Sequence, residues 1–69
     1  MNRTPVDSSN ISSIGYDTSL MTLEVEFLNG GIYQYFDVPE NVYTELMNSR
    51  SKGEFLSSQI KGHYRYART

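Results

Sequence analysis

The sequence predicts an α+β domain: a small antiparallel sheet of about three strands, covered on one face by one or two C-terminal helices. The first observation is a central hairpin over residues 20–38, where two runs of alternating side chains flank Asn29-Gly30-Gly31. The second is a pair of helix-start signatures after the hairpin, at Asp37 and at Ser51. The helices are therefore expected to pack on one face of the preceding sheet.

The segment before the hairpin predicts one strand. Residues 1–10 are polar and are expected to be irregular. Residues 11–16 are expected to form the first strand, although Gly15 weakens a strand at that point. Asp17-Thr18-Ser19 then predicts the turn that leads into the hairpin.

The length of the hairpin loop decides which side chains face the core. A two-residue loop pairs Leu28 with Gly31. Tyr33 and Tyr35 then lie on the solvent face beside the glutamates, because a slip of one residue moves every side chain across the sheet. A three-residue loop, with a glycine in the left-handed conformation, pairs Phe27 with Gly31 and places both tyrosines on the core face.

We prefer the three-residue loop because it collects five large side chains on one face, which a chain this short needs for a core. Tyr33 then lies opposite Val25, and Tyr35 follows on the same face. The same register leaves Ile32 and Phe36 exposed on the face that carries the two glutamates.

A first helix is predicted over about residues 39–48. Asp37 is placed at its N-cap, with Glu40 completing a capping box. Pro39 falls in the first turn, where it has no helical donor to lose. The apolar residues that follow share one stripe: Val42, Tyr43, Leu46 and Met47.

A second helix is predicted to start at Ser51, with Glu54 completing another capping box. It is expected to end near Lys61, and Gly62 suits the position that follows. Residues 63–69 alternate again and predict either a short edge strand or a loose tail. The buried stripe of this helix is expected to hold Phe55, Leu56, Gln59 and Ile60.

The chain of 69 residues is expected to be a single domain, with residues 1–10 and 63–69 loosely ordered. It contains no cysteine and one histidine, His63, which excludes disulfides and a histidine-rich metal site. No apolar run approaches the roughly 20 residues of a membrane span, and the first residues lack the apolar core of a secretory signal. A cytoplasmic protein without cofactor or membrane contact is therefore expected.

The net charge of −2 is unevenly distributed. Residues 1–49 hold seven acidic residues and one basic, whereas residues 50–69 hold five basic residues and one acidic. This asymmetry favours an anionic partner at the C-terminal end, or mutual neutralisation of the two parts within the fold.

Several short motifs follow one another along nearly the whole chain: Val-Asp-Ser-Ser-Asn-Ile at 6–11, Ile-Gly-Tyr-Asp at 14–17, Tyr-Gln-Tyr at 33–35, Val38-Pro39, Ser-Lys-Gly-Glu-Phe at 51–55 and Ile60-Lys61. The ordered set resembles the KTSC domain. The resemblance implies a small bacterial or phage domain of a kind also found at the C-terminus of some lysyl-tRNA synthetases. The function of that family is not established, and its association with synthetases suggests RNA binding.

The residues do not predict an enzyme. Ser8 and Ser9 lack a nucleophile-elbow context, and Asp7 beside them is typical of a turn or cap. Glu24 and Glu26 alternate along one strand, as solvated strand carboxylates do. No spacing of carboxylates or histidines predicts a metal site.

Nucleic-acid binding is the leading functional hypothesis. Residues 61–68 interleave aromatic and basic side chains, a pattern typical of sites for single-stranded RNA or DNA. The competing interpretation is that the strand tyrosines are core residues with their hydroxyls at the rim. The candidate residues are Lys61, Tyr64, Arg65, Tyr66 and Arg68, with Tyr33 and Tyr35 as a second platform.

A protein-interaction role is the alternative hypothesis. Ile32 and Phe36, if exposed beside an acidic strand, suit a protein partner or a homodimer better than RNA. An unpaired edge strand would also accept a strand from a partner.

Overall fold

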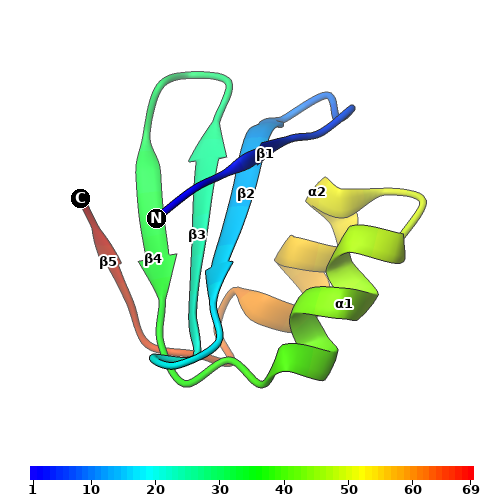
Figure 1. The fold of residues 1–69 in the computed structure, drawn as a ribbon. Helices are drawn as coiled ribbons and strands as arrows, with labels where there is room; N and C mark the ends of the chain where they lie inside the picture. The colour runs from blue at the N-terminus through cyan, green and yellow to red at the C-terminus, as the bar shows by residue number, and fades with distance from the viewer.

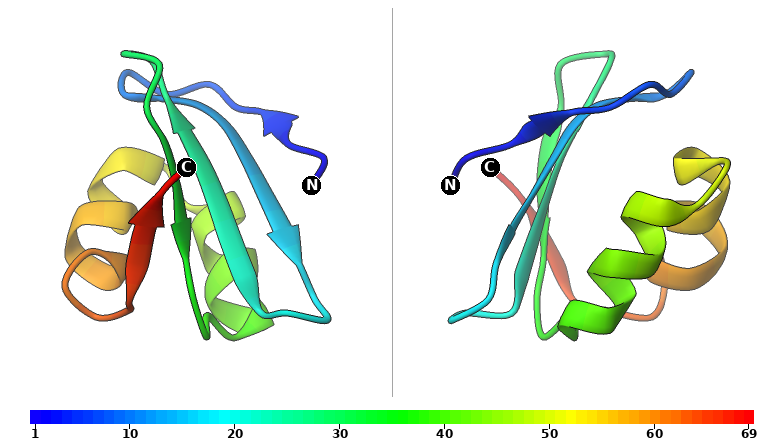
Figure 2. Two further views of the ribbon diagram at one scale, coloured as in Figure 1. Left: turned by 90° about the vertical axis from the view of Figure 1, so that its left-hand side faces the viewer. Right: turned by 45° about the vertical axis from the view of Figure 1, so that its right-hand side comes forward.

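The computed structural model describes all 69 residues as two layers (Figure 1). One layer is a five-stranded antiparallel sheet in the order β1-β2-β3-β4-β5. The other layer consists of the helices, which cover one face of that sheet (Figure 2). The predicted α+β class is confirmed, whereas the expected number of about three strands is wrong because each end of the chain adds a strand.

The two added strands are β1 (Thr4–Pro5) and β5 (Tyr66–Arg68), at opposite edges of the sheet. The prediction that residues 1–10 are irregular throughout is therefore wrong. Of the two alternatives predicted for residues 63–69, the structure has the short edge strand. The prediction that residues 1–10 and 63–69 are loosely ordered stays a prediction. The inner strands are β2 (Ile11–Asp17), β3 (Thr22–Phe27) and β4 (Ile32–Tyr35).

The hairpin of β3 and β4 has the three-residue loop. The backbone N–H of Phe27 donates to the carbonyl of Gly31 at 2.8 Å, and Gly30 has a φ of 97°. Val25 lies opposite Tyr33 in the ladder. The preferred register is therefore confirmed, and the left-handed conformation at position 30 explains why a glycine is needed there.

The core lies between the sheet and the helices. All four residues of the expected first-helix stripe contact it, and Leu46 is fully buried. Ile32 and Phe36 are half-buried, so the prediction that they are exposed is wrong. The nine buried apolar residues are Ile11, Ile14, Leu23, Val25, Tyr35, Val38, Leu46, Leu56 and Ile60.

Helix α1 (Glu40–Asn48) starts one residue later than predicted, with Pro39 at its N-cap and no side-chain cap. The capping box predicted for Asp37 is wrong. Asp37 has a φ of 59°, and its carboxylate accepts a hydrogen bond from Arg65 at 2.9 Å. The reason is tertiary: the next residue, Val38, donates its backbone N–H to Met21 and joins the core, which fixes the chain direction before the helix begins.

Helix α2 (Lys52–Phe55) is capped as predicted, because the Ser51 hydroxyl accepts the backbone N–H of Glu54 at 3.3 Å. It continues as one π-helical turn, η1 (Leu56–Ile60), in which the N–H of Lys61 donates to the carbonyl of Leu56. The wider turn keeps Leu56 and Ile60 in the core and leaves Gln59 exposed, so Gln59 was wrongly assigned to the stripe. No helix of the chain has the length and apolar character needed to cross a membrane.

Candidate nucleic-acid interface

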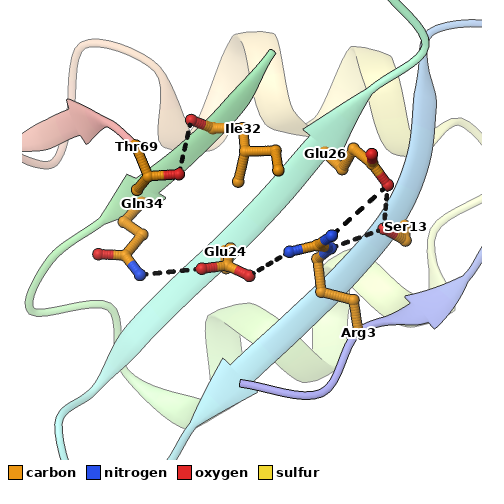
Figure 3. Close-up of polar contacts among 7 residues, drawn as sticks. All are labelled: Arg3, Ser13, Glu24, Glu26, Ile32, Gln34 and Thr69. Atoms are coloured by element: carbon orange, nitrogen blue, oxygen red, sulfur yellow. Dashed lines mark hydrogen bonds and ion pairs between the residues drawn. The ribbon is translucent and has the colours of Figure 1, made fainter. Parts of the chain in front are cut away.

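The two faces of the sheet carry different chemistry. Side chains of Tyr33 and Tyr35 lie on the face that the helices cover, in register with the core residues of β3. Glu24, Glu26 and Gln34 lie on the open face (Figure 3). The aromatic and acidic side chains of the hairpin are therefore separated by the thickness of the sheet.

A groove lies where β4 and β5 meet the end of η1. We name it the aromatic groove. It combines the end of β3, the hairpin loop, β4, the residues after η1 and β5, which are brought together only by the tertiary fold. Its lining residues are Phe27, Asn29, Tyr33, Tyr35, Lys61, Gly62 and Tyr66.

The four rings of the aromatic groove contact one another. Phe27 and Tyr33 meet edge to face, with centroids 5.7 Å apart. Tyr66 leans on both strand tyrosines, with centroids 6.0 Å from Tyr33 and 6.0 Å from Tyr35. Tyr66 is 63% exposed whereas Tyr35 is 3% exposed. Tyr66 therefore offers a ring surface to a ligand, and Tyr35 forms the floor.

Two cations lie at the rim of the aromatic groove. The Lys61 ammonium is 5.3 Å from the centroid of the Phe27 ring, and the Arg68 guanidinium is 5.8 Å from that of Tyr33. Both side chains are exposed and have no acidic partner within the protein. Such cation–π contacts hold the charges beside the rings while leaving them free for an anionic ligand.

The two remaining residues predicted from the tail lie elsewhere. Tyr64 is half-buried and packs against the core. Arg65 lies over the Phe36 ring at 5.7 Å and forms an ion pair with Asp37. Both line a second, shallower groove that shares Gly62 and Tyr66 with the first.

The structure therefore gathers five of the seven predicted residues at the aromatic groove: Lys61, Tyr66, Arg68, Tyr33 and Tyr35. Sequence reasoning missed Phe27, Asn29 and Gly62 as lining residues. The alternation of β3 identifies Phe27 only as a core side chain. Its position beside Lys61 depends on how η1 packs on the sheet, for which the sequence contains no local signal.

The burial of Tyr35 and its neighbouring tyrosines both affect the pKa of its hydroxyl. Burial raises the pKa of Tyr35 above its usual value of 10.0, and the nearby hydroxyls of Tyr33 and Tyr66 raise it further. The floor of the aromatic groove thus presents a neutral hydroxyl that both donates and accepts hydrogen bonds.

The carboxylates of the open face are held by the N-terminal segment (Figure 3). Arg3 donates to Glu24 and to the Ser13 hydroxyl, and lies 3.7 Å from a carboxylate oxygen of Glu26. Gln34 donates to the other oxygen of Glu24 at 2.9 Å. These contacts offset the negative charge of this face. No group of three or more His, Cys, Asp or Glu residues is arranged to hold a metal ion.

Comparison with known proteins agrees with this architecture. The KTSC domain model matches residues 7–64. The crystal structure of a KTSC domain protein from Yersinia pestis is 43% identical, superposes with a TM-score of 0.96, and is matched over 99% of this chain and 96% of that one. An uncharacterised protein of Stutzerimonas stutzeri is 41% identical over 99% of this chain and 97% of its own length.

A lysine–tRNA ligase of Nostoc sp. is 42% identical over 60 residues, which are 87% of this chain. The match spans only 11% of the length of that ligase. The similarity thus extends over nearly the whole length of two of these proteins and over a small part of the ligase. The chain belongs to the KTSC domain family.

Proposed function

We propose that this domain binds single-stranded RNA through the aromatic groove, in a binding rather than a catalytic role. The observation that carries the proposal is the position of Tyr66, an exposed ring supported by two buried or half-buried tyrosines and flanked by Lys61 and Arg68. Single-stranded nucleic acids are held in this way, with bases stacked on aromatic side chains and phosphates beside cations.

The distribution of charge supports the same proposal. Glu24 and Glu26 are on the opposite face of the sheet, where Arg3 contacts both carboxylates. In the alternative two-residue register these glutamates would lie beside the tyrosines and repel phosphates. The confirmed register leaves no acidic side chain in the lining of the aromatic groove.

The relatives add a separate argument. One matched relative is a lysine–tRNA ligase, which by its name acts on tRNA. A domain fused to such an enzyme benefits from affinity for RNA, because tethering raises the effective concentration of the second contact. A domain with the same groove would retain that affinity outside the ligase.

The test is an NMR titration of the labelled domain with a mixed pool of short single-stranded RNAs, at about 50 and then about 200 mM salt. Shifts are expected at Lys61, Tyr66 and Arg68 and in β4, and binding should weaken with a slope near 0.7 per phosphate contacted. Lys61→Ala should weaken binding, whereas Lys52→Ala, a lysine outside the aromatic groove, should not.

Absence of any shift at low salt would overturn the proposal. So would equal losses in the two lysine variants, because binding would then depend on overall charge and not on the aromatic groove.

A protein partner is the second candidate function. The outer edge of β5 has no neighbouring strand in the sheet, so its backbone groups can accept a strand from a partner or from a second copy. Sedimentation analysis tests this: a concentration-dependent dimer that tolerates salt would favour it over RNA, provided that the dimer is lost when Arg68, whose backbone N–H faces away from β4, is replaced by proline.

A further inference from the structure

Tyr35 has a hydroxyl group that the protein does not use. The residue is 3% exposed, yet its hydroxyl has no hydrogen-bond partner within the chain. By contrast, the hydroxyl of Tyr16 on β2 donates to the carbonyl of Val38. The Tyr35 hydroxyl therefore adds no hydrogen bond to the fold, and a phenylalanine would fill the same place in the core.

The hydroxyl of Tyr35 must open into the aromatic groove. No side-chain nitrogen or oxygen of the chain is both sealed from solvent and unpaired, so this hydroxyl reaches the surface. Tyr35 lines the aromatic groove together with Phe27, Tyr33 and Tyr66. The floor of an otherwise aromatic site thus carries one polar group.

We propose that the aromatic groove seats one unpaired nucleobase against Tyr66, and that the Tyr35 hydroxyl hydrogen-bonds the polar edge of that base and sets the base preference. The inference rests on the proposed function and assigns the part of the RNA that enters the groove. Asn29 supplies a second polar group at the rim, because its side-chain oxygen accepts from Gly31 and its amide nitrogen has no protein partner.

The position of the cations argues for a base, and against a phosphate, inside the groove. Lys61 and Arg68 lie over the rings of Phe27 and Tyr33 at the exposed rim. The buried floor has no charged group, since a tyrosine hydroxyl is neutral at neutral pH and burial raises the pKa of Tyr35 further. A phosphate would therefore remain outside beside the cations, and the flat, uncharged part of the nucleotide would enter.

The test compares wild type with Tyr35→Phe, which removes only the hydroxyl. Affinities are measured for hexamers of uridine, adenosine and cytidine, and for an inorganic polyphosphate of similar charge. Wild type should distinguish the hexamers, and Tyr35→Phe should lose about three- to tenfold in affinity for the preferred one and little for the others. Tyr66→Ala should weaken all three hexamers by roughly fivefold or more.

Tyr43→Phe is the matched control. Its ring stacks on Tyr16 at 4.8 Å, outside the aromatic groove, and its hydroxyl is also unpaired. This variant should bind every hexamer as wild type does. Circular dichroism of each variant establishes that the fold is retained.

The outcomes separate the two proposals. If no hexamer binds, the proposed function fails. If the hexamers bind but Tyr35→Phe keeps the wild-type preference, RNA binding stands and the role of Tyr35 is overturned. If polyphosphate binds as tightly as the hexamers, base insertion is overturned because the interaction is then with phosphate alone.

Discussion

The Arg3 guanidinium donates a hydrogen bond to the Glu24 carboxylate across the width of β2. Glu24 is 7% exposed and receives a second hydrogen bond from Gln34. The N-terminal segment thus crosses the open face of the sheet and closes over a carboxylate. This contact joins residues 21 positions apart, on the face of the sheet opposite the aromatic groove.

Removing the guanidinium should destabilise the domain in a pH-dependent way. Burial alone would raise the pKa of Glu24, but hydrogen bonds from Gln34 and Arg3 and the positive charge of Arg3 hold it below its usual value of 4.5. The ionised pair therefore stabilises the fold above about pH 4.5, and this stabilisation is lost as the pH falls through the folded-state pKa.

Arg3→Gln is expected to lower the free energy of unfolding by about 1–3 kcal/mol at neutral pH, measured by urea denaturation. The difference from wild type should shrink below about pH 4. Arg50→Gln, an exposed arginine without an ion pair, is the control and should change little. A difference that stays constant with pH would show that the pair is not responsible.

Gly15 should tolerate no side chain. A β-carbon at this position would lie 2.6 Å from the backbone oxygen of Asn2, where the N-terminal segment crosses β2. Gly15→Ala is therefore expected to cost about 1–3 kcal/mol or to detach that segment. Thermal denaturation measures the cost, and amide exchange at Arg3–Val6 reports detachment.

Gly53→Ala is the matched comparison for Gly15→Ala. A β-carbon at position 53 would meet only the Asn10 side chain, at an ordinary distance of 3.7 Å. The variant should be neutral or more stable by up to about 1 kcal/mol, because alanine favours the helix. Equal losses in the two variants would contradict the close approach at Gly15.

The N-cap hydrogen bond of Ser51 should contribute measurably to the free energy of unfolding. Its hydroxyl accepts the backbone N–H of Glu54, which would otherwise lack a partner in the first turn of α2. Ser51→Ala is expected to cost about 1 kcal/mol in urea denaturation. Ser57→Ala, an exposed serine within η1, is expected to be close to neutral, and a loss as large as that of Ser51→Ala would argue against the cap.

The domain should lose stability in alkali. Burial raises the pKa of Tyr16, helped by the charges of Glu40 and Asp17, and burial also raises that of Tyr35. Both phenols ionise more readily in the unfolded chain, so stability should fall as the pH rises above 10.0. The slope should be smaller in Tyr35→Phe and smallest when Tyr16→Phe is added, measured by denaturation at about pH 9 and about pH 11. An unchanged slope in the double variant would refute this origin.

Local chemistry determined the parts of the fold that the sequence predicts well. The alternation in β3, the glycine at position 30 and the need for one apolar face together select the three-residue loop, because only that register places Tyr33 on the core face of the sheet. The cap at Ser51 is also local, since it joins residues three positions apart. The resemblance to the KTSC domain, which the family model confirms over residues 7–64, also rests on short motifs of neighbouring residues.

Tertiary structure decided what local patterns cannot encode. The residues around Asp37 predict that it is a helix N-cap, but its carboxylate pairs with Arg65, 28 residues away. β1 is too short and polar to be predicted as a strand, and the sequence left β5 open between an edge strand and a loose tail. Both strands exist because β2 and β4 offer unpaired edges. The sequence by itself determined the hairpin register and the residue types at the candidate site. Only the packing of η1 and β5 against β4 brought Lys61 and Tyr66 beside Tyr35, because contacts between distant segments depend on the whole fold.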